Sequence, residues 1–193
     1  MNKELRIIAG KFRGRKIIFS DQNVTLRPTM DRVRETLFNW LAPYIVGADC
    51  LELFAGSGVF SFEAISRGAN FSLAVEYNYD TYQNIIKNCK KLEIEQQIFQ
   101  IIHQDVLLFL NNNLQYRKFN IIFLDPPYTY DQNILLSILK LLVNNHFLQK
   151  NSKIYFETDK DLQEFKDSLY IFGLQLKKIS KAGKVYFYLY EYL

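Results

Sequence analysis

The sequence predicts an α/β protein with a mostly parallel sheet that is covered by helices on both faces. A chain of 193 residues with 49% apolar residues can bury one sizeable core, so we expect a single domain. From residue 49 onward, short apolar segments alternate with amphipathic ones, which is typical of right-handed strand-helix-strand units. At the end of the chain, two apolar segments are separated by the four residues KAGK, which leaves no room for a helix and predicts an antiparallel hairpin.

The first elements that we expect are a hairpin and a helix. Residues 6–19, RIIAGKFRGRKIIF, place two apolar runs around a basic centre, which predicts a hairpin whose turn displays Lys11, Arg13 and Arg15. After Pro28, apolar residues recur at helical spacing until Pro43 and Gly47 end the helix. The expected buried face of this helix holds Val33, Leu37, Trp40 and Leu41, and the opposite face holds Arg32, Glu35 and Asn39.

The elements of the sheet follow in a regular order. The expected strands are residues 50–54, 71–76, 97–103, 120–125 and 153–157. The expected helices are residues 59–67, 80–92, 106–112, 133–144 and 160–168. The segments LQLKKIS and VYFYLYEYL form the expected C-terminal hairpin. We therefore divide the single domain 1–193 into an extension, residues 1–45, and a core, residues 46–193.

The positive charge of the chain is concentrated near its N-terminus. The net charge is +4. Residues 1–40 hold nine Lys and Arg against four acids, or +5, whereas the remaining 15 basic and 16 acidic residues give −1. This asymmetry is expected of a segment that contacts a polyanion.

Several classes of protein are excluded by composition. No run approaches the roughly 18 apolar residues of a membrane span, and the N-terminus lacks the pattern of a signal peptide, so we expect a cytoplasmic protein. Cys50 and Cys89 lack metal-site or redox spacing, and His103 and His146 are isolated. We therefore expect neither a metal site nor a disulfide.

A glycine loop joins the first strand of the sheet to its helix. In ELFAGSGVF, residues 52–60, Gly56 and Gly58 allow a tight turn and a close approach of the backbone to a ligand. Phe60 replaces the third glycine of the dinucleotide fingerprint, which argues against a cradle for a pyrophosphate.

Two acids extend this nucleotide-type site. Glu76 ends the second strand about 20 residues after the glycines, where a carboxylate can accept both hydroxyls of a ribose. Asp105 follows the third strand and can accept from an adenine amine. A ligand with adenosine but without pyrophosphate indicates S-adenosylmethionine.

LDPPY, residues 124–128, follows the fourth strand. Pro126 and Pro127 restrict the backbone and make the strand end rigid. The Asp125 carboxylate and the Pro126 carbonyl can accept from one exocyclic amine, and Tyr128 offers a ring on which a base can stack. These acceptors would orient the nitrogen toward the sulfonium methyl group and stabilise the positive charge that develops on it.

At this point the chain resembles a known family. Four segments in this order, RIIAGKFRGRK, LRPTMDRVRETLFNWL, LELFAGSGVFSFEAISRGA and IIFLDPPY, are similar to the bacterial RsmD-type 16S ribosomal RNA guanine-N2 methyltransferases. The resemblance covers nearly the whole chain. It implies a Rossmann-like class I fold with a seven-stranded sheet, S-adenosylmethionine as methyl donor, and one 16S rRNA guanine as target in a partly or fully assembled small subunit. We expect a monomer.

The resemblance also implies roles for individual residues. The loop of Gly56 and Gly58 would hold the methionine part of the cofactor, Glu76 its ribose and Asp105 its adenine, and Phe54 and Ala55 would also bind the cofactor. Asp125, Pro126, Pro127 and Tyr128 would hold the target base. Glu52, which would also bind the cofactor, stands where the family commonly has Asp, and its carboxylate reaches one methylene further than that of Asp. Contacts with RNA are expected from Lys11, Arg13, Arg15, Lys16, Arg27, Arg32 and Arg34.

Other functions fit part of the pattern. A DNA adenine-N6 methyltransferase could use the same DPPY motif, although no separate target-recognition segment interrupts the core. A non-catalytic RNA-binding assembly protein would suit the basic extension but has no need of the cofactor acids. A nicotinamide oxidoreductase is weakened by Phe60, and C5 methylation of a pyrimidine lacks a cysteine near the proline bracket.

Overall fold

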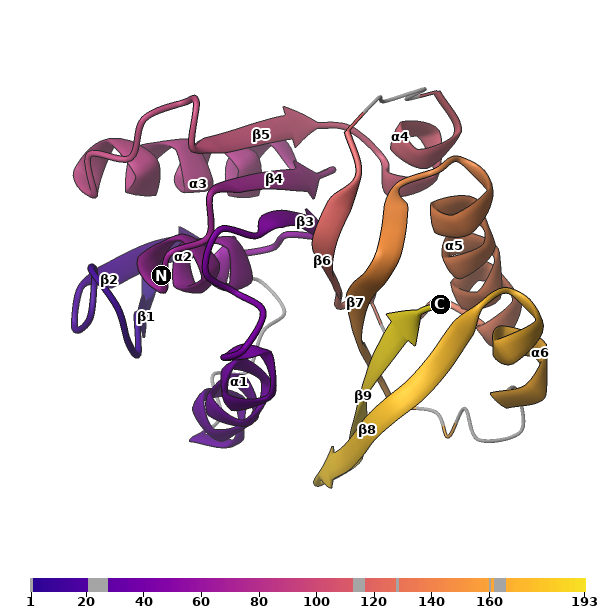
Figure 1. The fold of residues 1–193 in the computed structure, drawn as a ribbon. Coiled ribbons are helices and arrows are strands. Elements are labelled where there is room, and N and C mark those ends of the chain that lie inside the picture. The colour runs from indigo at the N-terminus through magenta and orange to yellow at the C-terminus, as the bar shows by residue number, and fades with distance from the viewer. Residues whose placement is uncertain (1, 21–27, 113–116, 128, 160, 162–165) are drawn as a thin grey trace.

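The computed structural model describes residues 2–20, 28–112, 117–127, 129–159, 161 and 166–193 (Figure 1). The small N-terminal sheet pairs β1 (Asn2–Arg6) with β2 (Lys16–Ser20), and α1 (Pro28–Leu41) follows. The strands of the seven-stranded sheet are β3 (Asp49–Leu53), β4 (Phe71–Glu76), β5 (Phe99–His103), β6 (Phe119–Leu124), β7 (Leu148–Thr158), β8 (Leu174–Ala182) and β9 (Val185–Tyr192). The helices between them are α2 (Val59–Ser66), α3 (Tyr79–Lys91), α4 (Val106–Asn112), α5 (Gln132–Asn144) and α6 (Lys166–Ile171).

The strand order of the large sheet is β5-β4-β3-β6-β7-β9-β8. The pairs from β5 to β7 are parallel, whereas β9 lies antiparallel to both β7 and β8. The predicted parallel sheet and the predicted C-terminal hairpin are therefore confirmed. The order reverses between β3 and β6, and open α/β sheets bind their ligands beyond the carboxyl ends of the strands at such a point.

The strand β7 is much longer than the sequence predicts. We expected residues 153–157, but β7 begins at Leu148 and continues through the polar residues Lys150–Ser152. The buried Ser152 hydroxyl donates to the Phe119 carbonyl at 2.7 Å, so this polar stretch is held to β6 by a side chain. Its polarity interrupts the apolar pattern by which strands are predicted.

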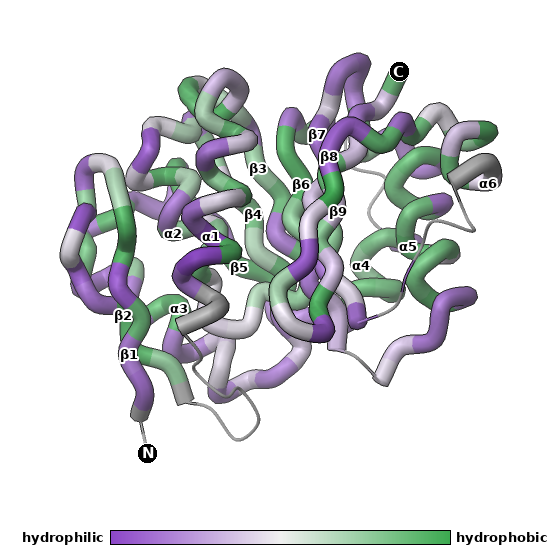
Figure 2. Tube along the Cα trace, turned by 90° about the horizontal axis from the view of Figure 1, so that it is seen from below, coloured by the Kyte–Doolittle hydropathy of each residue, from purple (hydrophilic) through white to green (hydrophobic). Residues whose placement is uncertain are grey.

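Two hydrophobic layers lie on the two faces of the sheet, and each strand contributes to both because side chains alternate along it. Along β6, Ile121 and Phe123 belong to the layer under α1, α2 and α3, whereas Ile122 and Leu124 belong to the layer under α4, α5 and α6. Figure 2 shows these two groups of helices on opposite sides of the sheet.

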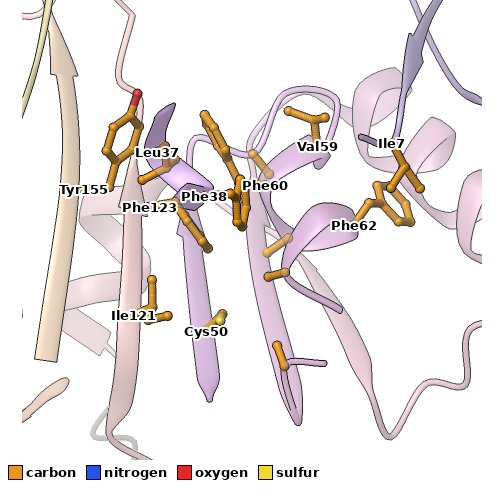
Figure 3. Close-up of a cluster of buried hydrophobic side chains, with 14 of the residues drawn as sticks. Ile7, Leu37, Phe38, Cys50, Val59, Phe60, Phe62, Ile121, Phe123 and Tyr155 are labelled. Atoms are coloured by element: carbon orange, nitrogen blue, oxygen red, sulfur yellow. The ribbon is translucent and has the colours of Figure 1, made fainter. Parts of the chain in front are cut away.

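The N-terminal helix is part of the core. Phe38 lies 5.8 Å from the Phe123 ring centroid, and the Phe60 ring stacks on Phe123 at 5.3 Å (Figure 3). Leu37 and Leu41 are fully buried, which confirms the predicted apolar face. The described residues of α1 are therefore packed against the sheet.

The predicted hairpin is present, and its first strand begins earlier than expected. Ile7 and Ile8 lie in the connection rather than in a strand. This connection is bound to α2: the Glu63 carboxylate accepts from the Ile8 N–H at 2.8 Å, and the Ser66 hydroxyl accepts from the Phe12 N–H at 2.9 Å. The hairpin is thus fixed to the core by buried polar contacts.

The other side of the hairpin lies along α3. The Asn88 side chain accepts from the Ile18 N–H at 2.9 Å and donates to the Ile18 carbonyl at 2.7 Å. Both backbone groups of Ile18, which lies on an edge strand, are therefore hydrogen-bonded. The Lys11 N–H donates to the carbonyl of Ser66, the last residue of α2, at 2.7 Å. The tip of the hairpin therefore lies at the edge of the sheet where the parallel strands begin.

Gly10 allows the hairpin to approach α2 this closely. Its φ is +82°, and a Cβ at this position would lie 1.8 Å from the Ser66 carbonyl oxygen. Gly14 has a similar φ of +81° but no atom within 4 Å of a Cβ, so it is a matched control.

We predict that Gly10→Ala destabilises the protein by several kcal/mol, because the new Cβ overlaps the backbone of α2 and the residue keeps a positive φ. Gly14→Ala should cost only the roughly 1 kcal/mol of a positive φ. Urea unfolding of both variants measures the difference. Equal losses of stability would contradict the close contact between the hairpin and α2.

Candidate active site

Four acids lie at the carboxyl ends of neighbouring parallel strands. Glu52 is on β3, Glu76 ends β4, Asp125 follows β6, and Glu157 is near the end of β7. By the alternation of side chains, all four fall on the face that α1, α2 and α3 cover. The sheet therefore gathers carboxylates that are distant in the sequence on one edge and one face.

The glycine loop turns through three residues with positive φ. Phe54 has φ 58°, Gly56 has φ 53°, and Gly58, the residue that precedes α2, has φ 72°. The Ala55 N–H donates to the Val75 carbonyl at 3.0 Å, which ties the loop to β4. A Cβ on Gly58 would lie 3.3 Å from both Ile85 and Phe62, so this position is sterically tight. Phe54 is strained for a non-glycine residue, as is common at ligand sites.

Glu52 holds the start of α2. It is 1% exposed and accepts from the N–H groups of Phe60 at 3.2 Å and Ser61 at 2.9 Å. Burial raises its pKa to about 7, against the opposing effect of these hydrogen bonds. The carboxylate predicted to contact the cofactor is thus engaged with the free N–H groups of a helix N-terminus.

Glu76 binds the loop from the neighbouring strand. One carboxylate oxygen accepts from the Gly56 N–H at 2.8 Å, and the other accepts from the Asn78 N–H at 2.7 Å. Burial raises its pKa above the usual value. The structure therefore brings together Glu76 and the glycines, as the sequence predicts for a ribose site.

Asp105 lies at the start of α4 and accepts from the Leu108 N–H at 3.0 Å. Burial raises the pKa of Tyr130, and the negative charge of Asp105 raises it further, which places Asp105 near the Tyr130 hydroxyl. The Tyr130 ring packs edge-on against Phe54 at 5.3 Å. Tyr130 thus connects the glycine loop, Asp105 and the segment after β6.

Asp125 is half-buried and Pro126 is buried, whereas Pro127 is exposed. The Pro127 carbonyl accepts from the Tyr130 N–H at 2.9 Å, which closes a turn. Burial raises the pKa of Asp125 to about 6. Among the described residues, none donates a hydrogen bond to its carboxylate. Tyr128 lies outside the described residues.

Glu157 is a site residue that the sequence reasoning missed. Its strand lies next to β6, with Leu124 opposite Phe156, and the Tyr155 hydroxyl donates to its carboxylate. Burial and the neighbouring Asp125 raise the pKa of Glu157 to about 8. Glu157 is the last residue of the predicted strand 153–157, just as Glu76 is the last residue of the predicted strand 71–76, so its position could have identified it as a site residue.

The predicted RNA-binding residues fall into separate places. Lys11, Arg13, Arg15 and Lys16 are exposed on the hairpin, and Lys16 pairs with Glu4 at 2.6 Å. Arg32 is exposed on α1. The structure does not bring the hairpin residues next to Asp125, because they lie at the opposite edge of the sheet. Arg27 lies outside the described residues.

Arg34 differs from the other basic residues. It is 3% exposed and donates to Asp31 at 2.6 Å and to the Arg6 carbonyl at 3.1 Å. Its Nε and Nη1 have no hydrogen-bond partner in the part of the chain that the structure describes. A guanidinium buried in this way joins α1 to the hairpin and is not open to an RNA backbone.

No group of three or more potential metal ligands occurs among the described residues. Cys50 and Cys89 are free thiols whose pKa values burial raises. None of the described helices is long and apolar enough to cross a membrane.

The strand order, the glycine loop and the acids at one edge define a methyltransferase of the Rossmann-like class. The chain matches the family model described as Conserved hypothetical protein 95 over residues 5–191. It is 42% identical over 159 residues to ribosomal RNA small subunit methyltransferase D of Haemophilus influenzae. The aligned region covers 82% of this chain and 80% of that protein. It is 40% identical over 192 residues to the protein of the same name from Buchnera aphidicola, with 97% and 94% covered. The chain belongs to the ribosomal RNA small subunit methyltransferase D family.

Two solved structures share the fold over nearly their whole length. The yhhF protein of Escherichia coli has a TM-score of 0.84 at 35% identity, with 98% of each chain covered. A Haemophilus influenzae protein has a TM-score of 0.81 at 38% identity, with 99% of each chain covered.

The raised pKa of Glu52 predicts a dependence of stability on pH. Because the folded protein binds this proton more tightly than the unfolded chain does, the stabilisation is complete below about pH 4.5 and is lost as the pH rises through about 7. We predict that Glu52→Gln flattens this fall in the free energy of unfolding. Urea unfolding between pH 4.5 and 8 compares the variant with the parent, and both proteins retain the titrating acids Asp125 and Glu157. Parallel curves would show that Glu52 does not titrate in this range.

Proposed function

We propose that the protein transfers the methyl group of S-adenosylmethionine to the exocyclic N2 amine of a guanine in 16S ribosomal RNA. Relatives with 40% and 42% identity carry the name ribosomal RNA small subunit methyltransferase D, which supports this class of substrate. The choice of guanine N2 rests on the family resemblance of the sequence motifs. The proposed substrate is a partly or fully assembled small subunit in the cytoplasm, and the proposed active form is a monomer.

The glycine loop and Glu76 fit the cofactor. The Glu76 carboxylate accepts the Gly56 N–H on one oxygen and the Asn78 N–H on the other, and its remaining lone-pair capacity can accept a ribose hydroxyl. Asp105, at the next strand end, provides an acceptor for the adenine amine. The cofactor supplies an electrophilic methyl group, while these residues bind and orient it.

The observation that carries the proposal is the state of Asp125. Its carboxylate is half-buried at the carboxyl end of β6, and burial raises its pKa to about 6. Such an acceptor, on a backbone stiffened by Pro126 and Pro127, is suited to an exocyclic amine, which also needs the Pro126 carbonyl for its second hydrogen. The ionised carboxylate stabilises the positive charge that forms on nitrogen as the methyl group is transferred.

The proton that the methylated nitrogen then loses can pass to the ionised Asp125 carboxylate. Glu157 lies beside Asp125, and its raised pKa of about 8 means that it is largely protonated near neutral pH. Asp125, with a pKa of about 6, is ionised at neutral pH and able to accept the amine.

The proposal is tested by transfer of a labelled methyl group from S-adenosylmethionine to undermethylated small subunits, naked 16S rRNA and DNA, followed by nucleoside analysis. We expect N2-methylguanosine from a ribosomal substrate. Label in N6-methyladenine of DNA would instead assign the protein to adenine methylation, and an absence of label with intact RNA binding would indicate a non-catalytic binder.

Glu76→Ala is predicted to weaken binding of S-adenosylhomocysteine roughly tenfold or more, because a hydrogen bond to a charged group contributes about 1.5 to 3 kcal/mol. Isothermal titration measures this affinity. Glu35→Ala, which removes an exposed acid from α1, is the control and should bind as the parent does. An unchanged affinity in the Glu76 variant would remove Glu76 from the cofactor site.

A further inference from the structure

A second carboxyl group lies beside the one that we assign to the target amine. Leu124 and Phe156 are partners in the parallel pairing of β6 and β7, so the next residues, Asp125 and Glu157, come side by side. Neighbouring strands are about 4.8 Å apart, and the alternation of side chains turns both carboxyl groups to the same face of the sheet. Burial and then the charge of Asp125 raise the pKa of Glu157, which also places the two groups close together. A base that reaches Asp125 therefore lies next to Glu157.

Glu157 is held in a defined orientation. The Tyr155 hydroxyl donates to its Oε1 atom. The Tyr155 ring is fully buried and packs edge-on against Phe60 at 5.6 Å, so the position of this hydroxyl is fixed by the core (Figure 3). On the other side, Glu157 is the partner of Phe187 in the antiparallel pairing of β7 and β9. Glu157 is thus a fixed polar group that remains partly exposed at the carboxyl edge.

The carboxyl group of Glu157 can both accept and donate hydrogen bonds. Its raised pKa of about 8 means that it is largely neutral near neutral pH. In a neutral carboxyl group, one oxygen is an acceptor and the other carries a proton that it can donate. Because Oε1 accepts from Tyr155, the proton falls to Oε2. Glu157 therefore offers an acceptor and a donor next to each other.

The Watson–Crick edge of guanine is complementary to the two carboxyl groups. It presents the N2 amine, the N1–H donor and the O6 acceptor in that order. When Asp125 and the Pro126 carbonyl bind the amine, the N1–H and O6 follow on the same edge, where the acceptor and the donor of Glu157 can bind them. Adenine has neither an N1–H nor an O6, so it would leave part of this carboxyl group unpaired.

We propose that Glu157 binds the N1–H and O6 of the target guanine and makes the site specific for this base. The inference rests on the proposed function, because it adds a second contact to the base whose amine Asp125 binds. Asp125 contacts the reacting nitrogen, whereas Glu157 contacts the part of the edge that distinguishes guanine from adenine.

The test compares two bases in single-turnover methyl transfer, with S-adenosylmethionine saturating and small subunits below saturation, so that the rate includes binding of the base. The small subunits are reconstituted with 16S rRNA that carries guanine or 2-aminopurine at the nucleotide that the parent methylates. 2-Aminopurine keeps the N2 amine but lacks the N1–H and O6. For the parent, we expect guanine to react roughly 10 to 100 times faster, because 2-aminopurine leaves polar groups of the site unpaired.

Three variants show whether Glu157 is the source of this preference. Glu157→Ala should slow the reaction of guanine by about the same factor and leave that of 2-aminopurine nearly unchanged, so the preference is lost. Glu157→Gln keeps one acceptor and one donor in a similar shape and should retain most of the preference. Glu35→Ala removes an exposed acid from α1 and should keep the parent's preference. Because each protein is compared on both bases, their intrinsic difference in reactivity cancels.

An affinity for S-adenosylhomocysteine equal to that of the parent shows that each variant is folded. The inference is overturned if Glu157→Ala keeps the parent's preference for guanine. It is also overturned if this variant slows both bases equally, since Glu157 would then act on the amine or on the fold and not on the N1–H and O6.

These outcomes are separable from the outcome for the proposed function. If the parent forms N2-methylguanosine and Glu157→Ala keeps the parent's preference, the contact is wrong and the function stands. If the parent forms no N2-methylguanosine, the proposed function fails, and the inference fails with it.

Discussion

The contact on which the rest of the structure depends is the buried carboxylate of Glu52 at the start of α2. It accepts from the N–H groups of Phe60 and Ser61 and so fixes the angle at which the chain leaves β3 and enters the helix. The glycine loop between these two fixed points must turn through positive φ, and Glu76 binds its exposed Gly56 N–H from the neighbouring strand. At the other end of the same helix, Glu63 and Ser66 hold the hairpin. One short helix therefore determines both the shape of the loop and the position of the N-terminal segment.

The same edge of the sheet keeps several carboxyl groups away from water. Burial raises the pKa values of Glu52, Asp125 and Glu157, and each ionised acid makes ionisation of its neighbours less favourable. Such an arrangement lowers stability at neutral pH, and it persists because the backbone N–H groups of α2 and the Tyr155 hydroxyl compensate part of the cost. A cluster of titratable groups with shifted pKa values is frequent at catalytic sites. Here it surrounds the position that we propose for an amine that becomes positively charged.

Much of the fold and part of the site could be predicted from the sequence, because strand and helix periodicities are local. The glycine loop, Glu76 and Asp125 were placed correctly at strand ends by the same reasoning. The role of Glu52 in holding α2, the burial of Arg34 and the contact of the hairpin with α2 depend on tertiary packing, which no local pattern encodes. The early start of β7 was missed because the Ser152 hydroxyl, and not an apolar side chain, stabilises its polar stretch. Glu157 becomes part of the site only through the pairing of β7 with β6.

The central claim is that the half-buried Asp125 carboxylate at the end of β6 receives the amine that is methylated. The most direct measurement is the single-turnover rate of methyl transfer by Asp125→Ala, with cofactor and RNA saturating. We predict that the variant folds and binds S-adenosylhomocysteine as the parent does, while its rate falls by about 10² to 10³, the effect of removing one preorganised polar contact from a transition state. The parent rate should rise with pH through about 6 as Asp125 ionises. A folded, cofactor-binding Asp125→Ala protein that methylates RNA at the parent rate would contradict the account.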